Sequence, residues 1–393
     1  MNRWVCLIDS GGKAVRAARN NGFPVLLVQS PTNLKSSISL ADAVVVLDYL
    51  DEELLATTVE RMRAGMTGDL AAVLSFTELG TVPAARLATR LDVPGQTVSG
   101  AVKSRDKLAM RLELARTGRY TAPFAACWCP WDVERAVRDL GTPVVLKRSD
   151  GMGKNGVRLV RREPDVTAAL AALAPRADQL PVLAEKCIVG REFSVESMVV
   201  NGEVTPFAIA AKETDAETFV ELCHMVPADL TEQEERHLLD ANEHCLRTLG
   251  VDNAICHTEI MLAEGGPCIV ETHSRPGGDF ISDLIVHAGG LEIYDAFFGA
   301  LAGRAPADAV RLERVATVRF LSAVGSYRQG LEVDPVRELP GIVDAQVYAD
   351  RGVRALRSNA DRAGHVIASG VSRQQIDSAA RQAVQLLTRE VHR

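Results

Sequence analysis

The stretch Thr258–Asp279, TEIMLAEGGPCIVETHSRPGGD, decides the fold prediction because it has the pattern of a β-hairpin with charged side chains on one face. Apolar and polar residues alternate with a period of two on both sides of Gly265-Gly266, which is typical of two strands joined by a tight turn. A three-residue loop that begins at Glu264 would set Glu259 directly opposite Glu271, with Cβ atoms roughly 5 Å apart. Two carboxylates at that distance repel each other, so the pattern predicts a cation between them. Mg²⁺ is the expected ion because it prefers oxygen ligands from carboxylates and substrate phosphates.

On the same face of the predicted hairpin, His273 and Arg275 follow Glu271 at steps of two residues. They would place an imidazole and a fixed positive charge beside the two carboxylates. The alternative interpretation is a surface hairpin whose charges are only solvated.

The composition indicates a soluble globular protein with two or three domains. The chain has 393 residues, of which 47% are hydrophobic and 24% are charged. A net charge of -7 argues against a general binder of nucleic acid or anionic membranes, but it allows a local basic pocket for a phosphate. No apolar run approaches the roughly 20 residues that span a bilayer, and the first residues resemble a strand and not a signal peptide.

The eight cysteines follow neither the spacing of a zinc site nor that of a disulfide framework, so we expect reduced thiols and a cytoplasmic protein. Cys127 and Cys129 have no second pair that would complete a metal site, so we expect them to fill space.

The first hundred residues alternate short apolar runs with helical patterns, which predicts a small open parallel α/β sheet. The expected strands are Trp4–Ile8, Val25–Val28, Ala43–Leu47 and Ala71–Leu74, and the expected helices are Asp51–Ala64 and Leu79–Leu91. The loop Asp9–Gly12 resembles one that lets a ligand approach a helix start, although it lacks the full G-x-G-x-x-G. Glu78 lies just past the fourth strand, where the carboxyl ends of strands form ligand crevices. Its alternative role is to complement the charge of a helix N-terminus.

Two lysines and a glycine loop follow. Ser104–Arg116 predicts a helix with Lys107 near its start, and Thr142–Lys147 predicts a buried strand that ends in a lysine. The loop Arg148–Gly156 contains three glycines, which suits a flap whose backbone N–H groups close over phosphates. Its spacing differs from G-x-x-x-x-G-K-[ST] and no helix follows it, so the sequence excludes the common nucleotide-triphosphatase fold.

The middle of the chain changes to an antiparallel pattern, with a hairpin turn at Asn201-Gly202. The further expected strands are Pro181–Ile188, Glu192–Val200, Glu203–Ala211, Val315–Ser322, Gly341–Tyr348 and His365–Ser369. The further expected helices are Thr231–Leu249, Phe280–His287, Leu291–Ala302 and Arg373–Arg389.

These features, in this order, resemble the ATP-grasp superfamily of carboxylate–amine ligases over nearly the whole chain. Within the superfamily the chain looks most like the L-amino-acid (dipeptide) ligases, and the stretches that carry the resemblance are VLSFTELGTVPAARLATRLDVPG, SRDKLAMRLELARTG, EKCIVGREFSVESMVVNGEV and VETHSRPGGDFISDL. The resemblance implies an α/β and α+β multidomain protein with the ATP-grasp fold. Its expected parts are an N-terminal open parallel α/β domain at 1–98, an ATP-grasp domain at 99–305 with a small ATP-clamping subdomain at about 122–190, and a C-terminal α+β lid domain at 306–393.

The resemblance also implies a site for ATP and Mg²⁺, with Mn²⁺ as an alternative metal. The residues that it assigns to ATP are Lys107 and Lys147 at the phosphates, Ser149, Gly151, Gly153 and Gly156 in the flap, Glu185, Lys186, Cys187 and Ile188 at the adenine, and Glu192 at the ribose. The metal ligands that it assigns are Glu259, Glu271 and His273. Because His273 stands where the family usually has Asn, a hydrogen bond to a phosphate is its alternative role. The expected catalytic residues are Arg275, which would steady the acyl phosphate and the tetrahedral intermediate, Lys147 and Glu271.

The substrate pocket implied by the resemblance contains Glu78, Glu221, His224, Arg275, Gly277, Gly278 and Asp279. The alternative role of His224, in an apolar strand, is that of a satisfied core histidine. Asp279 in such a pocket indicates a polar or cationic group on the substrate, and its alternative role is the N-cap of the helix that begins at Phe280.

The function that the resemblance implies is ATP-dependent amide formation. A carboxylate, expected to belong to an amino acid, would be phosphorylated by MgATP, and an amine would then displace the phosphate to give an amide or peptide, ADP and phosphate. The alternatives are an ATP-grasp enzyme with a different acceptor, as in purine-biosynthetic or biotin-carboxylating relatives, and a nucleotide-binding regulatory protein without turnover. The expected partners are small-molecule carboxylate and amine substrates and a second copy of the chain, with no nucleic acid and no membrane.

Overall fold

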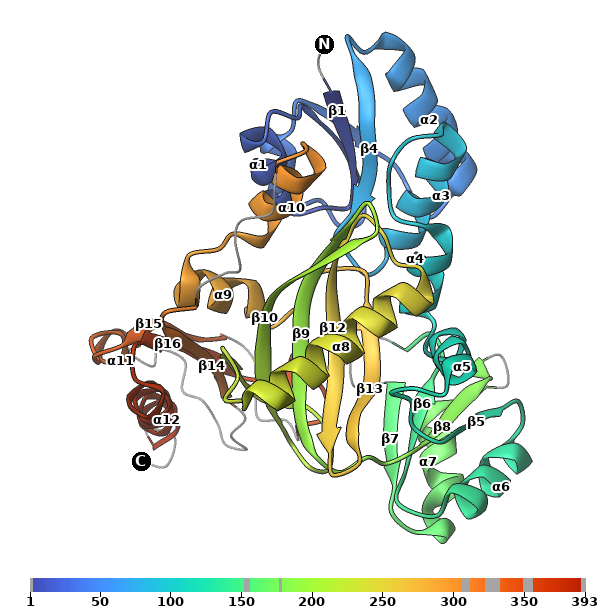
Figure 1. Ribbon diagram of the computed structural model, residues 1–393, viewed down its shortest axis with the longest axis vertical. Helices are drawn as coiled ribbons and strands as arrows, with labels where there is room; N and C mark the ends of the chain where they lie inside the picture. The colour runs from blue at the N-terminus through green and yellow to red at the C-terminus, as the bar shows by residue number, and fades with distance from the viewer. Residues whose placement is uncertain are drawn as a thin grey trace.

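A parallel sheet, a small antiparallel sheet and a long central sheet divide the molecule into three regions (Figure 1). The structure is a computed structural model that describes residues 3–151, 156–176, 179–304, 312–321, 333–348 and 356–389. Gly153, predicted for the flap, lies outside the described residues. The parallel sheet and the small sheet lie at opposite ends of the longest axis of the molecule, with the central sheet between them.

The N-terminal region is an α/β sheet with the strand order β3-β2-β1-β4, in which every pair is parallel. Its elements are β1 (Arg3–Ile8), α1 (Gly12–Asn20), β2 (Val25–Gln29), η1 (Ser36–Leu40), β3 (Ala43–Val46), α2 (Glu52–Gly65), β4 (Asp69–Ser75) and α3 (Thr81–Leu91). The side chain of Asp51 accepts a hydrogen bond from the backbone N–H of Leu54 and so caps α2. The predicted open parallel sheet is confirmed, because buried apolar runs of five to seven residues between helices fold in only a few ways.

The second region is a small antiparallel sheet with the order β5-β8-β6-β7. It comprises β5 (Phe124–Cys127), α6 (Pro130–Leu140), β6 (Val144–Arg148), β7 (Val157–Val160), η3 (Glu163–Asp165), α7 (Val166–Leu173) and β8 (Val182–Lys186), and it is preceded by α4 (Val98–Arg105) and α5 (Lys107–Thr117). The predicted single helix Ser104–Arg116 is wrong. Asp106 breaks it, because its backbone is extended and its carboxylate accepts hydrogen bonds from Leu108 and Ala109, so that α5 begins at Lys107.

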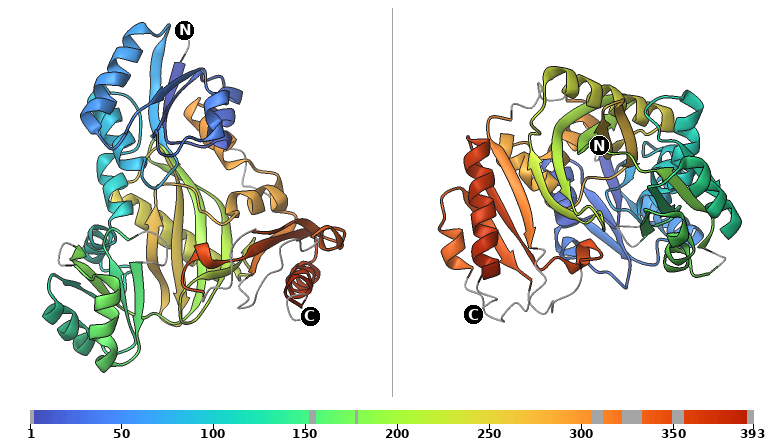
Figure 2. Two further views of the ribbon diagram at one scale, coloured as in Figure 1. Left: turned by 180° about the vertical axis from the view of Figure 1, so that it is seen from behind. Right: turned by 90° about the horizontal axis from the view of Figure 1, so that it is seen from below.

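The central sheet has eight strands in the order β13-β12-β9-β10-β11-β14-β16-β15. The strands are β9 (Arg191–Val200), β10 (Glu203–Thr214), β11 (Glu221–Val226), β12 (Ala254–Ala263), β13 (Gly266–His273), β14 (Val315–Leu321), β15 (Ile342–Val347) and β16 (Gly364–Gly370). The helices around it are α8 (Glu232–Leu249), α9 (Ile281–Gly289), α10 (Ile293–Leu301), α11 (Asp334–Arg337) and α12 (Arg373–Arg389), with η5 at Asn359–Asp361. The strands of the proposed C-terminal domain continue the same sheet, since β14 pairs with β11. Figure 2 shows α12 lying along these C-terminal strands.

The two faces of the central sheet differ in chemistry. Residues such as Phe193, Val199 and Ile260 pack under α8, which runs across the strands in Figure 1. Because strand side chains alternate, the neighbours Glu192 and Glu259 must lie on the opposite face. That polar face becomes the wall of the candidate site.

The hairpin β12–β13 pairs Glu259 with Glu271, as predicted. The predicted three-residue loop is wrong, because β12 ends at Ala263 and β13 begins at Gly266, which leaves two residues between the strands. A register shift beside Glu259 adds one residue on β13, which makes up for the shorter loop and keeps Glu259 opposite Glu271. Gly266 has a φ of +102°, a value that favours glycine at this turn.

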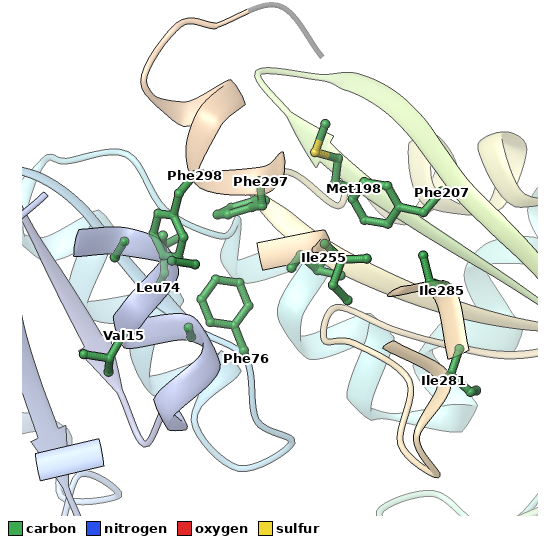
Figure 3. Close-up of a cluster of buried hydrophobic side chains, with 14 of the residues drawn as sticks. Val15, Leu74, Phe76, Met198, Phe207, Ile255, Ile281, Ile285, Phe297 and Phe298 are labelled. Carbon is green, nitrogen blue, oxygen red and sulfur yellow. The ribbon is translucent and has the colours of Figure 1, made fainter. Parts of the chain in front are cut away.

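A cluster of buried aromatic and aliphatic side chains joins the N-terminal region to α9, α10 and the central sheet (Figure 3). Phe76, just after β4, makes edge-to-face contacts with Tyr294, Phe297 and Phe298 at ring-centroid distances of 5.4, 5.5 and 5.8 Å. This packing fixes the end of β4 and therefore the position of Glu78, two residues further on.

Among the described residues no single helix is long and apolar enough to cross a membrane. Only α9 and α10 taken together, bent by 88° at their junction, reach that length and hydropathy.

We expect Phe76→Ala to lower the free energy of unfolding by about 3 kcal/mol, because it removes a buried ring that three aromatic neighbours contact. Urea unfolding followed by circular dichroism measures the change. Leu50→Ala is the control, since Leu50 is 56% exposed and its truncation should change the unfolding free energy by less than about 0.5 kcal/mol. Equal effects of the two substitutions would contradict the role given to the cluster.

Candidate active site

A cavity of about 460 Å³ lies against the polar face of the central sheet and reaches the small sheet. Most of the predicted site residues line it, although they come from every region of the chain. They are Glu78, Lys107, Lys147, Gly151, Glu185, Lys186, Cys187, Ile188, Glu192, Glu221, His224, Glu259, Glu271, His273, Arg275, Gly278 and Asp279. Three described residues of the prediction, Ser149, Gly156 and Gly277, do not line the cavity.

Two of these residues, Ser149 and Gly156, shape the flap next to the cavity wall. The Ser149 hydroxyl hydrogen-bonds the carboxylate of Asp106, the cap of α5, and so holds the start of the flap. Gly156 lies so close to Gly151 that a Cβ there would be 2.9 Å from the Gly151 Cα atom. The two glycines let the described ends of the flap meet.

The carboxylate pair Glu259 and Glu271 lies at the centre of the cavity wall, and each carboxylate contacts a lysine. Glu271 Oε2 is 3.0 Å from Lys107 Nζ, and Glu259 Oε1 is 2.5 Å from Lys212 Nζ. Burial alone would raise the pKa of Glu271, but Lys107, His273 and Lys147 outweigh it and hold that pKa well below its ordinary value. Burial alone would lower the pKa of Lys107, but Glu271 raises it above the ordinary value. Both groups are therefore charged at neutral pH.

Glu78 contacts His273 and Arg275, the two residues that follow Glu271 at steps of two. Its Oε2 atom lies 2.6 Å from Arg275 Nε and 3.3 Å from His273 Nδ1, and Arg105 approaches its other oxygen at 3.5 Å. Burial opposes ionisation, but the hydrogen bonds and charges of His273 and Arg275 lower the pKa of Glu78 to about 2. Glu78 precedes α3 by three residues and lines the cavity, which favours the crevice interpretation over the helix-terminus one.

At the small sheet, Glu185 on β8 lies between two cations. Lys147 Nζ is 2.7 Å from one carboxylate oxygen, and Arg111 Nε is 2.5 Å from the other. Burial would raise the pKa of Glu185, but these two charges lower it. Arg111 was missed by the sequence analysis, although it lies four residues after Lys107 and so shares its face of α5. Its guanidinium also donates to the carbonyls of Ile269 and Val270, which ties α5 to β13.

The predicted adenine hinge follows β8 directly. The N–H of Lys186 donates to Pro123 O at 2.9 Å, and the N–H of Cys187 donates to Pro143 O at 3.1 Å. The Lys186 ammonium donates to Gly141 O at 2.7 Å. These bonds fix the hinge within the small sheet, and Ile188 completes its part of the cavity wall.

Lys212 on β10 is the second residue that the sequence analysis missed. Its side chain is 1% exposed, and its ammonium lies 2.8, 3.7 and 2.5 Å from carboxylate oxygens of Glu192, Glu221 and Glu259. Burial would lower the pKa of Lys212, but the three carboxylates raise it well above its ordinary value. Regular pairing around the Asn201-Gly202 turn would set residue 211 opposite Glu192, and a register shift in β10 sets Lys212 there instead.

His257 is the third missed residue, and its place two before Glu259 on β12 was the available signal. Its Nδ1 is 2.6 Å from Glu196 Oε1 and its Nε2 is 3.3 Å from Glu259 Oε1. Burial would lower the pKa of His257, but these two carboxylates raise it to about 9. A Cβ at Gly277 would lie 2.8 Å from His257 Nδ1, so this glycine lets the chain pass directly behind the imidazole.

The far end of the cavity is closed by the proposed C-terminal domain. Asp279 is held by Arg362, whose Nη2 and Nη1 atoms lie 2.5 and 2.8 Å from its two oxygens, and by Asn359 Nδ2 at 3.4 Å. The alternative role of Asp279, as an N-cap, is wrong. Phe280 occupies the N-cap position of α9, and no side chain caps that helix. Asp279 and Phe280 have positive φ values of 54° and 66°, which turn the Asp279 carboxylate away from the helix and toward Arg362.

Asp279→Asn is expected to destabilise the protein at neutral pH by about 2 kcal/mol, because it leaves the buried Arg362 without its counter-charge. Burial would raise the pKa of Asp279, but Arg362 and His224 hold it well below its ordinary value. A depressed pKa stabilises the fold above the ordinary value of about 4 and loses that contribution as the pH falls below it. The difference in unfolding free energy between the two proteins should therefore be largest above about pH 5 and should narrow as the pH falls from 5 to 3, without vanishing there. A constant difference would contradict the charge account.

The donor set fits a divalent cation. Two carboxylates face each other across a strand pair, and carboxylate oxygens are the ligands that Mg²⁺ prefers. In the described part of the chain, no group of three or more His, Cys, Asp or Glu side chains has an arrangement that could hold a metal ion without other ligands. Lys107 and Lys212 supply the positive charge beside these carboxylates. A cation there would need further oxygen ligands from a phosphate or water.

Comparisons with known proteins agree with this geometry. Residues 140–283 match the family model of the ATP-grasp domain, and residues 319–392 match that of the L-amino acid ligase C-terminal domain 2. The uncharacterized protein y4rH of Sinorhizobium fredii is 26% identical over 95% of this chain and 78% of its own length. The alanine–anticapsin ligase of Bacillus subtilis is 27% identical over 53% of this chain and 48% of its own length, so the chain spans about half of that relative.

The crystal structure of the L-amino acid ligase from Bacillus licheniformis superimposes with a TM-score of 0.80 over 97% of each chain. The two chains are 19% identical, so this likeness shows a shared fold.

Proposed function

Because the chain belongs to the ATP-grasp superfamily of carboxylate–amine ligases, and within it resembles the L-amino-acid ligases, we propose that it joins an amino acid to an amine through an acyl phosphate. One observation carries the proposal: Lys107 and Lys147 come from different elements and line the same cavity as the facing carboxylates Glu259 and Glu271. Two cations and a carboxylate pair that suits a metal are what a triphosphate and its divalent ion require.

The chemistry proposed for the cavity is a two-step transfer. A carboxylate oxygen of the first substrate attacks the γ-phosphorus of ATP, the bond to the β-phosphate oxygen breaks, and ADP leaves. The amine nitrogen of the second substrate then attacks the acyl carbon and loses a proton, and phosphate leaves with the former carboxylate oxygen. Positioning and charge stabilisation carry both steps, so no protein nucleophile is needed.

The residues divide this work by position. Lys107 and Lys147 would hold the phosphates, and Glu259 and Glu271 would hold Mg²⁺, which supplies charge neutralisation on the phosphates when it is bound. Arg275, whose Nε atom contacts Glu78 at 2.6 Å, would stabilise the charge that develops on the acyl oxygen. Glu192 would take the ribose, and the hinge Glu185–Ile188 would take the adenine.

The state of the cysteines fits a cytoplasmic protein that acts on small-molecule substrates without a cysteine nucleophile. All eight cysteines are free thiols. Burial raises the pKa of the deeply buried Cys6 and Cys245 to about 12, which makes them poor nucleophiles.

The test is release of ADP and phosphate by the purified protein with MgATP, measured with single amino acids and with pairs. Mass spectrometry of the products should show an amide that equals the two substrates less one water. A pair that stimulates release and forms such an amide supports the proposal. ATP binding without stimulation by any carboxylate and amine would overturn it in favour of a regulatory role.

A further inference from the structure

The cavity wall contains a residue that no motif in the sequence indicated. Asn359, at the start of η5, lines the cavity together with His224 on β11 and Asp279 before α9. It lies 80 residues after Asp279 in the chain, and its Nδ2 atom donates to Asp279 Oδ2 at 3.4 Å. We call His224, Asp279, Asn359 and Arg362 the joint subsite, since the last two come from the proposed C-terminal domain and meet the first two beside the cavity.

The charges of the joint subsite are already balanced. Asp279 makes two short bonds to Arg362, at 2.5 and 2.8 Å, and the Arg362 guanidinium lies 3.6 Å above the ring of Phe320. A substrate cation would gain little from a carboxylate that Arg362 already neutralises, and a substrate anion would meet the Asp279 carboxylate. Of the two groups expected beside Asp279, polar or cationic, the polar one is therefore favoured, because Arg362 already neutralises Asp279.

Three buried polar atoms of the joint subsite have no hydrogen-bond partner among the described residues. His224 is 2% exposed, and neither ring nitrogen has a hydrogen-bond partner within the described ranges. Its nearest charged atom is Asp279 Oδ2, 3.5 Å from Nε2, in a contact that does not qualify as a hydrogen bond. The carbonyl oxygen of Asn359 is likewise buried, with no donor from the described residues. Buried polar atoms without partners are uncommon and destabilise the fold, so their occurrence on a cavity wall points to a ligand.

We propose that the joint subsite binds an uncharged substrate side chain that both donates and accepts a hydrogen bond, namely a primary amide or a hydroxyl. This rests on the proposed function, in which the cavity takes amino acids. The Asn359 carbonyl requires a donor and an N–H of His224 requires an acceptor, so one amide or hydroxyl satisfies both. A hydrocarbon side chain satisfies neither, and a site built for hydrogen bonds strongly rejects such an analogue.

The first experiment compares substrates of nearly equal shape. With a fixed amine and saturating MgATP, kcat/KM is measured for glutamine against methionine, asparagine against leucine, and threonine against valine. We expect at least one polar member to exceed its apolar partner by about 10-fold or more. Asn359→Leu should remove most of that preference by lowering kcat/KM for the polar substrate while changing the apolar one less than about 3-fold. Asn33→Leu, the same change at an exposed loop position, should leave both values unchanged.

The second experiment does not depend on turnover. Calorimetry with the ADP-loaded protein measures the binding of the same six amino acids to the wild type and to Asn359→Leu. Tighter binding of the polar members to the wild type alone supports the joint subsite even if no pair yields an amide, in which case only the proposed function fails. Equal or tighter binding of the apolar members, or a polar preference that survives in Asn359→Leu, overturns the inference.

Discussion

Replacing Glu271 by glutamine is expected to lower the rate of ADP release at least about 100-fold with saturating ATP and substrates. The amide keeps the size of the side chain but removes the charge that faces Glu259 and that contacts Lys107 at 3.0 Å. A weakened cation site and a displaced lysine should both reduce stabilisation of the charge on the transferred phosphoryl group. A coupled assay for ADP, run over a range of Mg²⁺ concentrations, measures the loss and any rise in the Mg²⁺ required.

Glu264→Gln is the matched control, because Glu264 lies in the exposed turn of the same hairpin and undergoes the same chemical change. Its rate should stay within about 2-fold of the wild type. If Glu271→Gln turned over at a comparable rate, the carboxylate pair would not be the cation site, and the interpretation of this hairpin would have to be abandoned.

The second large effect concerns stability. Lys212→Met should lower the free energy of unfolding without ligands by about 3–5 kcal/mol, because it leaves the carboxylates of Glu192 and Glu259 buried without their cation. MgATP should restore part of the loss, since a bound divalent ion also neutralises Glu259 and a ligand specific to the folded state adds stability by mass action. Urea unfolding with and without MgATP measures both quantities.

The matched control for Lys212 is Lys13→Met. Lys13 forms a half-exposed ion pair with Asp283 at 2.6 Å, and its loss should cost less than about 1 kcal/mol. If Lys212→Met cost no more than the control, the ammonium would not be the group that holds the carboxylates together.

Local patterns predicted the elements well where one signal dominated. The buried strands of the N-terminal sheet and the β12–β13 hairpin follow from short apolar runs and from alternation, and both occur as expected. Residues 140–283 match the model of the ATP-grasp domain and residues 319–392 match that of the L-amino acid ligase C-terminal domain 2, in agreement with the resemblance. The break at Asp106 was missed because a helix pattern continues across it, and only the capping hydrogen bonds show that a new helix begins.

The residues missed in the cavity share a physical reason. Lys212 reaches Glu192 through a register shift, and such shifts depend on tertiary packing that no period of two reveals. In the sequence Arg111 has the pattern of an ordinary helix residue, because its partner Glu185 lies 74 positions later and only the fold brings it beside Arg111. Asn359 lines the cavity and Arg362 binds Asp279 from the proposed C-terminal domain, where the sequence motifs of the family give no information.

The most direct test of the central claim follows one oxygen atom. The protein is supplied with MgATP, an amine and an amino acid whose carboxylate carries ¹⁸O, and the released phosphate is analysed by mass spectrometry. An acyl phosphate transfers one carboxylate oxygen to phosphate, so the account predicts phosphate heavier by one ¹⁸O for each amide formed, together with ADP. Amide formation with unlabelled phosphate, or with AMP and pyrophosphate in place of ADP, would contradict it.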